Sequence, residues 1–248
     1  MNSINLLNIK LNNLSDQALW SLLAGYLHSQ HNHLIVTVNP EFTLAAKKDQ
    51  LFRDVLNRAD LSLPDGFGLS LAALTYGQKL IRHTGADLTV ELLTYAEQNN
   101  LPIAIINWRN GLSPAKVLRP ALLAKFPKLQ LLIEDTGRTG QLGRRQMARL
   151  AQFQPAIILC SLGAPYQEYF LDKHKNAWTS ARIMIGVGGS FDFIIDRIKR
   201  APKLWRNSGL EWLWRLIQQP WRWRRIWQAV IVFSWQFLVW RSSNKKDR

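Results

Sequence analysis

The chain has 248 residues, enough to bury one sizeable core and leave additional chain over. Its formal net charge is +15, from 32 Lys and Arg against 17 Asp and Glu, and its hydrophobic fraction of 47% is normal for a globular protein. A single cysteine excludes an internal disulfide framework and is typical of a protein in a reducing compartment.

Along the chain, short apolar runs alternate with amphipathic segments. The runs are rich in Ile, Leu and Val and are bounded by loop residues, as strands buried on both faces should be. This alternation predicts an α/β fold, a parallel sheet with helices on both faces. We predict strands at 34–38, 103–107, 129–133, 156–161 and 183–187. We predict helices after Ser15 as far as 27, and at 86–98, 113–125, 141–153 and 166–176.

Polar and glycine-containing motifs mostly follow these strands, where ligands bind in open parallel sheets. In chain order they read TVNPEF (37–42), LPDGFG (63–68), RHTGADL (82–88), LGAPYQE (162–168), GVGGSFDF (186–193), KRAPKLW (199–205) and GLEWLWRL (209–216). Each also has a simpler interpretation. Pro-Asp-Gly is a common turn tripeptide, and Gly85 and Asp87 fit a turn followed by a helix start. GVGGSF fits either a tight turn or a phosphate-binding helix start.

Taken together and in this order, the motifs resemble the WecG/TagA/CpsF family of bacterial glycosyltransferases (family 26). The resemblance covers residues 37–216 and implies a Rossmann-like α/β domain with a C-terminal helical membrane-docking appendage. It implies an inverting transfer from a UDP-sugar to an undecaprenyl-diphosphate-linked acceptor. The sugar would be N-acetylmannosamine, its uronic acid or a related hexose, and the product a cell-surface polysaccharide or a teichoic acid.

On this resemblance we expect Asp65 to be the catalytic base, because a carboxylate in a partly closed cleft can have its pKa raised into a useful range. Other residues are expected to orient the sugar, contact the donor diphosphate and line the nucleotide site. They are Thr37, Asn39, Arg82, Gln167, Gly188, Gly189 and Asp192. The sequence has no Asp-x-Asp pair and no metal-ligand spacing among its histidines, so we expect no cofactor and a metal-independent enzyme.

Two segments depart from the family pattern. The family usually has a glycine-rich turn where this chain has NWRNGLSP, with Trp108 and Arg109. It often has a GYF-like segment where this chain has EDTGRTG, which includes Thr136. We therefore expect altered recognition of the donor sugar or nucleotide at these segments and leave the donor sugar, the acceptor and the final polymer unassigned.

Most of the positive charge is C-terminal. Residues 197–248 contain 13 Lys and Arg against two acids and eight of the 11 tryptophans, whereas residues 1–196 carry 19 basic and 15 acidic residues. We therefore expect a glycosyltransferase domain at 1–196 and a basic, Trp/Arg-rich appendage at 197–248. Arginine interleaved with tryptophan is typical of a segment at a membrane surface. The apolar segment 226–240 is shorter than the 20 or so residues of a spanning helix.

We expect Arg215, Arg222 and Arg225 to share one side of the appendage and to bind the diphosphate of the polyprenol carrier. The alternative is that they serve only general attraction to anionic lipid. The N-terminus lacks the features of a signal peptide, so the expected location is the cytoplasmic face of the bacterial inner membrane, as a peripheral protein. The sequence leaves the oligomeric state open, including a homo-oligomer formed through the apolar tail.

Two other classes of protein fit parts of the sequence. The charge of +15 and the Trp/Arg tail are also found in proteins that bind single-stranded nucleic acid. Against this class, 226–240 is too apolar for a nucleic-acid surface, and we expect no nucleic-acid partner. The second class is a non-catalytic membrane scaffold with the same fold, and the intact positions Asp65, Arg82 and Gln167 argue against it.

Overall fold

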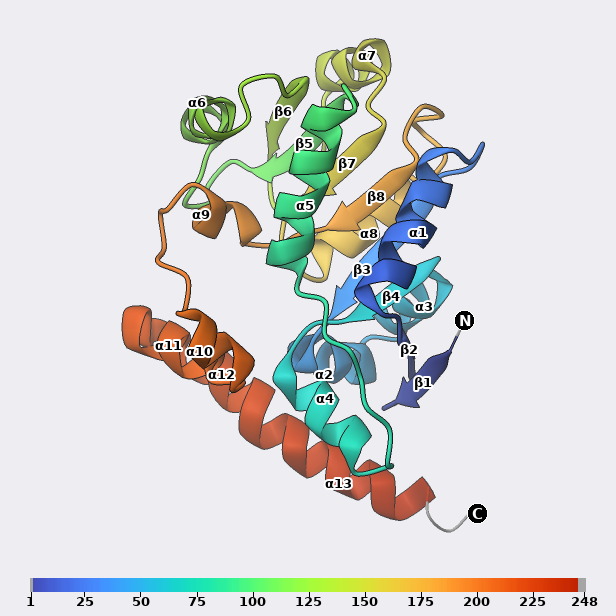
Figure 1. Ribbon diagram of the computed structural model, residues 1–248, viewed down its shortest axis with the longest axis vertical. Coiled ribbons are helices and arrows are strands. Elements are labelled where there is room, and N and C mark those ends of the chain that lie inside the picture. The colour runs from blue at the N-terminus through green and yellow to red at the C-terminus, as the bar shows by residue number, and fades with distance from the viewer. Residues whose placement is uncertain (1, 245–248) are drawn as a thin grey trace.

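A six-stranded parallel sheet forms the centre of the computed structural model, which describes residues 2–244 except for the side chains of Lys203, Asn207, Arg222 and Asn244 (Figure 1). The strands lie in the order β4-β3-β8-β7-β5-β6, and every neighbouring pair is parallel. They are β3 (His33–Val38), β4 (Leu61–Pro64), β5 (Ile103–Trp108), β6 (Leu131–Thr136), β7 (Ile157–Cys160) and β8 (Ile183–Gly186). The α/β, Rossmann-like architecture is confirmed.

All five predicted strands are present, but two differences matter for the site. The strand predicted at 129–133 lies at Leu131–Thr136, because it pairs with β5 through polar residues, with Asp135 opposite Asn107. Strand β4 was not predicted, since its sequence LSLP is short and ends in a proline. Pairing with β3 buries all four of its residues, and this brings Asp65 to the carboxyl edge of the sheet.

Helices cover both faces of the sheet, as predicted. Successive strand residues face opposite sides, so Leu34 and Val36 belong to one apolar cluster and Ile35 to the other. The cluster with Ile35 includes residues of α1 (Asp16–Leu27), α5 (Gly85–Gln98), α6 (Ala115–Lys125) and α9 (Ser190–Ile194). The opposite cluster includes residues of α2 (Pro40–Lys48), α3 (Gln50–Arg58), α4 (Phe67–Leu74), α7 (Arg144–Phe153), α8 (Tyr166–Lys173) and the hairpin of β1 (Ser3–Leu6) and β2 (Ile9–Asn12).

Helix α1 begins where the sequence predicts. The Oγ atom of Ser15 accepts a hydrogen bond from the backbone N–H of Ala18 at 3.2 Å, which satisfies one of the free N–H groups of the first turn. Helices α2, α3 and α4 were not predicted. Their segments are short, and α2 and α3 follow one another with only Asp49 between them, so no loop signal separates them in the sequence.

The C-terminal residues form a helical appendage along one edge of the molecule, beside α2 and α4 (Figure 1). Its longest part buries Phe233 and Phe237, and Tyr76 lies edge-on to Phe237 and Trp240. Among the described residues, no helix combines the length and apolar character needed to cross a membrane. The elements are α10 (Lys203–Asn207), α11 (Glu211–Gln218), η1 (Pro220–Arg222), α12 (Trp223–Trp227), η2 (Gln228–Val232) and α13 (Phe233–Asn244).

Candidate active site

A cavity of about 800 Å³ lies at the carboxyl ends of the strands. This volume falls in the range of small-molecule sites. Residues of both the sheet domain and the appendage line it, so the two parts build one site. Every predicted site residue whose side chain the structure describes lies on this cavity: Thr37, Asn39, Asp65, Arg82, Gln167, Gly188, Gly189, Asp192, Arg215 and Arg225. The side chain of Arg222 lies outside the described part of the chain.

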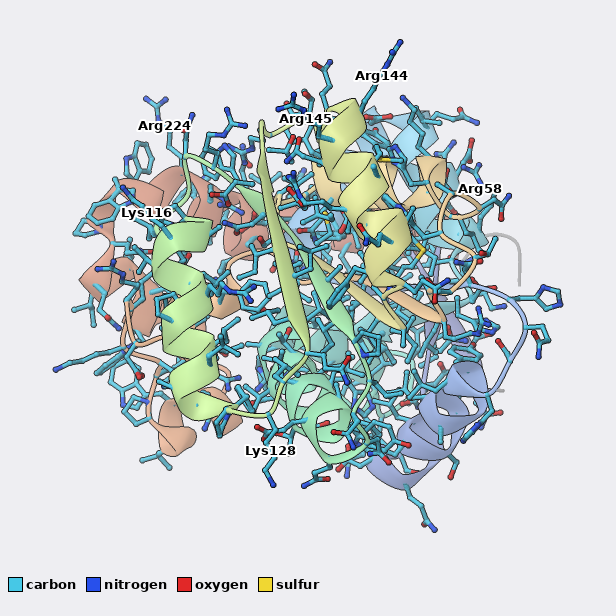
Figure 2. The ribbon with its side chains drawn as sticks, turned by 90° about the horizontal axis from the view of Figure 1, so that it is seen from above. Arg58, Lys116, Lys128, Arg144, Arg145 and Arg224 are labelled. Carbon is cyan, nitrogen blue, oxygen red and sulfur yellow. The ribbon has the colours of Figure 1, made fainter. Side chains whose placement is uncertain are left out.

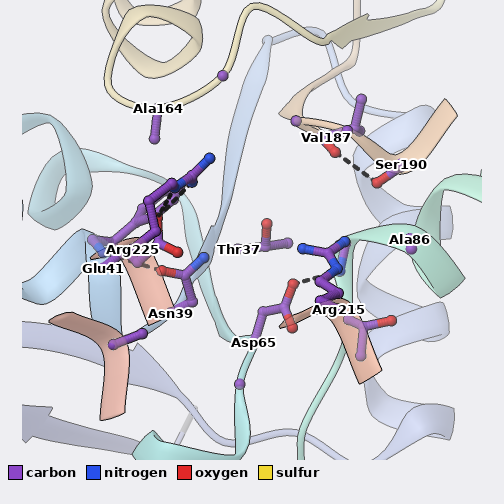
Figure 3. A pocket seen from close by; sticks show the side chains of 18 of the residues that line it. Thr37, Asn39, Glu41, Asp65, Ala86, Ala164, Val187, Ser190, Arg215 and Arg225 are labelled. Atoms are coloured by element: carbon purple, nitrogen blue, oxygen red, sulfur yellow. Dashed lines mark hydrogen bonds and ion pairs between the residues drawn. The ribbon is translucent and has the colours of Figure 1, made fainter. Parts of the chain in front are cut away.

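Asp65 lies directly after β4, next to Thr37 of the neighbouring strand (Figure 3). Its Oδ2 atom accepts a hydrogen bond of 3.0 Å from the backbone N–H of Gly85, the first residue of α5. A Cβ atom on Gly85 would lie 3.1 Å from the Oγ1 atom of Thr37 and 3.6 Å from Oδ2 of Asp65. The missing side chain of Gly85 therefore lets the helix start approach both residues closely.

Burial raises the pKa of Asp65 from its ordinary value of 3.8 to about 6. The Gly85 N–H opposes this shift, the Glu211 carboxylate adds to it, and Arg82 and Arg215 oppose it. At neutral pH the group is therefore mostly ionised, yet basic enough to accept a proton. Those are the properties that a general base needs.

Asn39 has a local structural role as well as a place on the cavity. Its Oδ1 atom accepts a hydrogen bond of 3.1 Å from the N–H of Phe42, and Pro40 occupies the first position of α2. This helix start fixes Glu41, which belongs to the motif TVNPEF but was assigned no role from the sequence. Both Nε and Nη2 of Arg225 donate to Oε2 of Glu41, at 3.1 and 2.5 Å (Figure 3). A residue predicted to bind the lipid diphosphate is therefore paired with a carboxylate.

Arg215 reaches the cavity from α11. Its guanidinium carbon lies 4.6 Å from the ring centre of Phe193. Burial lowers the pKa of Arg215, and the carboxylates of Glu211, Asp65 and Glu41 act in the opposite direction. Its Nε atom is buried without a hydrogen-bond partner among the described residues. A buried donor of this kind is costly unless a ligand satisfies it.

Arg82 and Arg200 attach the start of the appendage to the sheet domain. The Nη2 atom of Arg82 donates to the carbonyl oxygen of Arg206 at 3.1 Å. Arg200 makes two hydrogen bonds with Asp87 of α5, at 2.5 and 2.8 Å. Burial acts to raise the pKa of Asp87, but hydrogen bonds from Arg200 and Thr84 outweigh it and lower that pKa. Arg82 therefore lines the cavity, and one of its guanidinium N–H donors is already bonded to the Arg206 carbonyl.

Gln167 joins the loops that follow β7 and β8. Its Oε1 atom accepts hydrogen bonds from the N–H groups of Gly163, at 3.1 Å, and Gly188, at 3.0 Å. Its Nε2 atom donates to Glu168 at 2.6 Å. The backbone N–H of Gly188, predicted to face a phosphate, is therefore already engaged by a side chain. Gln167 therefore connects two loops of the cavity wall by hydrogen bonds, in the manner of a clamp.

Asp192 belongs to a hydrogen-bond network on the opposite wall. Its Oδ1 atom accepts from the hydroxyl of Ser113 at 2.6 Å. The side-chain amide of Asn107 donates to the carbonyl oxygen of Ser113 at 3.0 Å and to Asp135 at 2.7 Å, and its oxygen accepts from Ser161 at 2.7 Å. This network holds the loop after β5. One sign of this network is visible in the sequence, namely the polar Asn107 at the end of an apolar run.

Among the described residues, no group of three or more His, Cys, Asp or Glu side chains is arranged so that it could hold a metal ion. Cys160, the single cysteine, is buried, and burial raises the pKa of its thiol.

Comparison with known sequences gives one consistent result. The profile of the glycosyl transferase WecG/TagA/CpsF family matches residues 4–247. The chain is 32% identical to an N-acetylglucosaminyldiphosphoundecaprenol N-acetyl-β-D-mannosaminyltransferase of Bacillus spizizenii over 194 aligned residues. The aligned part covers 77% of this chain and 74% of that protein. A protein of the same name from Staphylococcus aureus is 28% identical over 221 residues, 89% of this chain and 85% of that relative.

Proposed function

Because the chain belongs to the WecG/TagA/CpsF family of glycosyl transferases, we propose that it transfers a sugar from a UDP-sugar to an undecaprenyl-diphosphate-linked acceptor, with inversion. The names of the relatives favour an N-acetylglucosamine-bearing lipid diphosphate as acceptor and N-acetylmannosamine as the first donor sugar to test. The observation that carries the proposal is a buried carboxylate, Asp65, with a pKa of about 6, beside arginines in one cavity. The product would enter a cell-surface polysaccharide or a teichoic acid.

In this mechanism Asp65 accepts the proton of the acceptor hydroxyl. The hydroxyl oxygen forms a bond to C1 of the donor sugar while the bond from C1 to the diphosphate oxygen breaks, and UDP leaves with the electron pair. Arg215, whose buried Nε has no hydrogen-bond partner among the described residues, balances the charge that develops. We propose that arginines and backbone donors do this work and that the transfer requires no metal ion.

The appendage supports a further part of the proposal, peripheral docking on the cytoplasmic face of the inner membrane. One stripe of its long helical segment packs on the sheet domain through Phe233 and Phe237. A second apolar stripe, at spacings of three and four residues, is exposed, which fits a helix lying in a lipid–water interface. Its residues are Trp227, Ile231, Trp235 and Leu238.

Arg215 and Arg225 would contact the carrier diphosphate at different depths of the cavity. Arg225 is exposed, lies beside the start of this stripe and is held by Glu41, so it meets the diphosphate at the mouth of the cavity. Arg215 lies deeper, near Asp65. Under the simpler interpretation of general lipid attraction, removing either charge would weaken vesicle binding slightly. Under the proposal, Arg215→Ala also abolishes turnover with a soluble short-chain acceptor.

The test is UDP release by purified protein with undecaprenyl-diphosphate-N-acetylglucosamine and a panel of UDP-sugars. We expect acceptor-dependent release with at least one donor, and a loss of about 10²- to 10⁴-fold in Asp65→Asn. The matched control is Asp196→Asn, an exposed carboxylate paired with Lys125 away from the cavity. Equal rates for the Asp65 variant and the wild type would reject the assignment of Asp65. No release with any donor, together with no binding of UDP, would reject the proposed function.

A further inference from the structure

The segments NWRNGLSP and EDTGRTG, singled out in the sequence, begin on paired strands, with Trp108 of β5 opposite Thr136 of β6. Trp108 ends β5, and Arg138 follows β6. The guanidinium carbon of Arg138 lies 4.8 Å from the ring centre of Trp108 and 5.6 Å from that of Tyr166, the first residue of α8. Arg138 and Trp108 both line the cavity. The rings attract the cation and limit its freedom.

Arg138 differs from two other arginines of the cavity in its partners and resembles Arg215, whose guanidinium also lies over an aromatic ring. Arg200 and Arg225 form ion pairs with Asp87 and Glu41. Within the described part of the chain, no carboxylate lies at ion-pair distance from Arg138, and its guanidinium contacts the two aromatic rings. Aromatic rings hold a guanidinium without neutralising it, so its charge and its N–H donors stay available to a ligand.

The place of Arg138 along the sheet edge indicates which ligand group it meets. Its Nη2 atom lies near the turn after β7, where a Cβ atom on Gly163 would be 3.5 Å away. Strand β7 is three positions from β4, which carries Asp65, and three strand spacings amount to about 14 Å. In an in-line displacement the leaving group departs on the side of C1 opposite the attacking hydroxyl, and therefore away from Asp65. The strand ends remote from Asp65 are those of β7, β5 and β6, and Arg138 lies among them on the cavity.

On the basis of the proposed function, we propose that Arg138 binds an anionic group of the donor, either its diphosphate or a carboxylate on its sugar. Trp108 and Tyr166 are positioning residues that hold the guanidinium over the Gly163 turn. The planar fork of an arginine donates two parallel hydrogen bonds to phosphate or carboxylate oxygens. In this proposal the segment after β6 supplies a cation to the donor end of the cavity.

The test is calorimetric binding of UDP, uridine, UDP-glucose and UDP-glucuronic acid to the full chain. The variant is Arg138→Gln, and the matched control is Arg144→Gln, an exposed arginine that points away from the protein in Figure 2. We expect Arg138→Gln to weaken binding of an anionic ligand by about 10- to 100-fold, the loss of one hydrogen-bonded charge, with uridine binding unchanged. We expect Arg144→Gln to bind every ligand as the wild type does.

The ligands distinguish the two anion sources. Weaker binding of UDP itself assigns Arg138 to the diphosphate, whereas weaker binding of UDP-glucuronic acid alone assigns it to a sugar carboxylate, and either result supports the inference. Unchanged binding of all four ligands, or an equal loss for uridine, would overturn the inference and leave the proposed function standing. Failure of the wild type to bind any uridine nucleotide would overturn both.

Discussion

The backbone N–H of Gly85 donates a hydrogen bond of 3.0 Å to Oδ2 of Asp65, yet burial still raises the pKa of this carboxyl from 3.8 to about 6. The folded protein therefore binds this proton more tightly than the unfolded chain does. The contribution of Asp65 to stability is most favourable below pH 3.8 and declines as the pH rises toward 6. At neutral pH the ionised group costs the fold about 2–3 kcal/mol.

Replacement of the charge should recover that free energy. We expect Asp65→Asn to raise the free energy of unfolding by about 2 kcal/mol at pH 7.5 and to change it little at pH 4. The amide oxygen can still accept the hydrogen bond from Gly85. Urea unfolding at the two pH values measures the difference, with Asp196→Asn as the control. A gain of the same size at both pH values would show that the ionisation of Asp65 is not its cause.

The same pKa should appear in catalysis. We expect kcat/KM to rise with pH through an apparent pKa near 6, as Asp65 becomes ionised. Because the carboxylate of Glu211 contributes to the upward shift, Glu211→Gln should move this acid limb to lower pH. Initial rates between pH 5 and 8 measure both profiles. An acid limb that stays in place in Glu211→Gln would contradict the electrostatic coupling between the appendage and Asp65.

Two glycines offer opposite outcomes for the same substitution. A Cβ atom on Gly186 would lie 2.5 Å from Nε2 of Gln167 and 2.7 Å from Oε1 of Glu168. Gly186→Ala should therefore destabilise the fold by about 1–3 kcal/mol and weaken UDP binding. Gly25 lies in the last turn of α1, and among the described residues no atom outside the helix's own backbone lies within 4 Å of its Cβ position, so Gly25→Ala should stabilise the fold by up to about 0.5–1 kcal/mol. Thermal unfolding of both variants checks the pair. If Gly186→Ala left the stability unchanged, the side chains of Gln167 and Glu168 would be able to move aside without loss of free energy.

If the exposed apolar stripe docks on lipid, membrane binding should depend on its large apolar side chains. Ile231→Ser and Trp235→Ser should each lower partition onto anionic lipid vesicles by about tenfold, because each removes a large apolar side chain from the interface. Leu51→Ser is the matched control, since Leu51 is equally exposed on α3, outside the appendage. Vesicle sedimentation measures the partition. Equal losses for all three variants would indicate that the stripe has no special part in docking.

The ion pair of Arg225 and Glu41 gives a prediction about the acceptor. Because Glu41 competes with a diphosphate for the guanidinium, Glu41→Gln should lower the acceptor KM by up to about fivefold with little change in stability. Arg225→Gln should raise that KM. Steady-state kinetics with the lipid-linked acceptor measures both. If Arg225→Gln left the KM unchanged, Arg225 would have no role in acceptor binding.

The sequence predicted the parallel sheet because five of its strands are apolar enough to be recognised on their own. Strand β4 was not predicted, because a short segment that ends in Pro64 resembles a loop in the sequence and only its pairing with β3 shows that it is a strand. The predicted site residues of the sheet domain line the cavity, and most of their motifs follow a strand end. The start signal of α2 was present in the sequence, as Asn39 followed by Pro40, and would have placed Glu41 in the first turn of a helix.

Contacts between distant segments could not be read from the sequence. The segments that contain Trp108 and Arg138 were noted separately, and Arg138 itself was not singled out, because nothing in the sequence indicates that the two side chains stack. In the same way, the partners of Arg225 and Gln167 depend on how loops and helices far apart in sequence are packed. Hydrophobic periodicity reports burial and not partner identity, so roles that rest on a hydrogen bond needed the coordinates.

Glu211 and Arg215 of the appendage face the same cavity as Thr37 and Asp65 of the sheet domain. A substrate that touches both parts therefore acts as a link between them. By reciprocity, the factor by which an engaged appendage tightens substrate binding equals the factor by which bound substrate tightens engagement of the appendage. We therefore expect substrate binding and packing of the C-terminal helices on the sheet domain to be thermodynamically coupled.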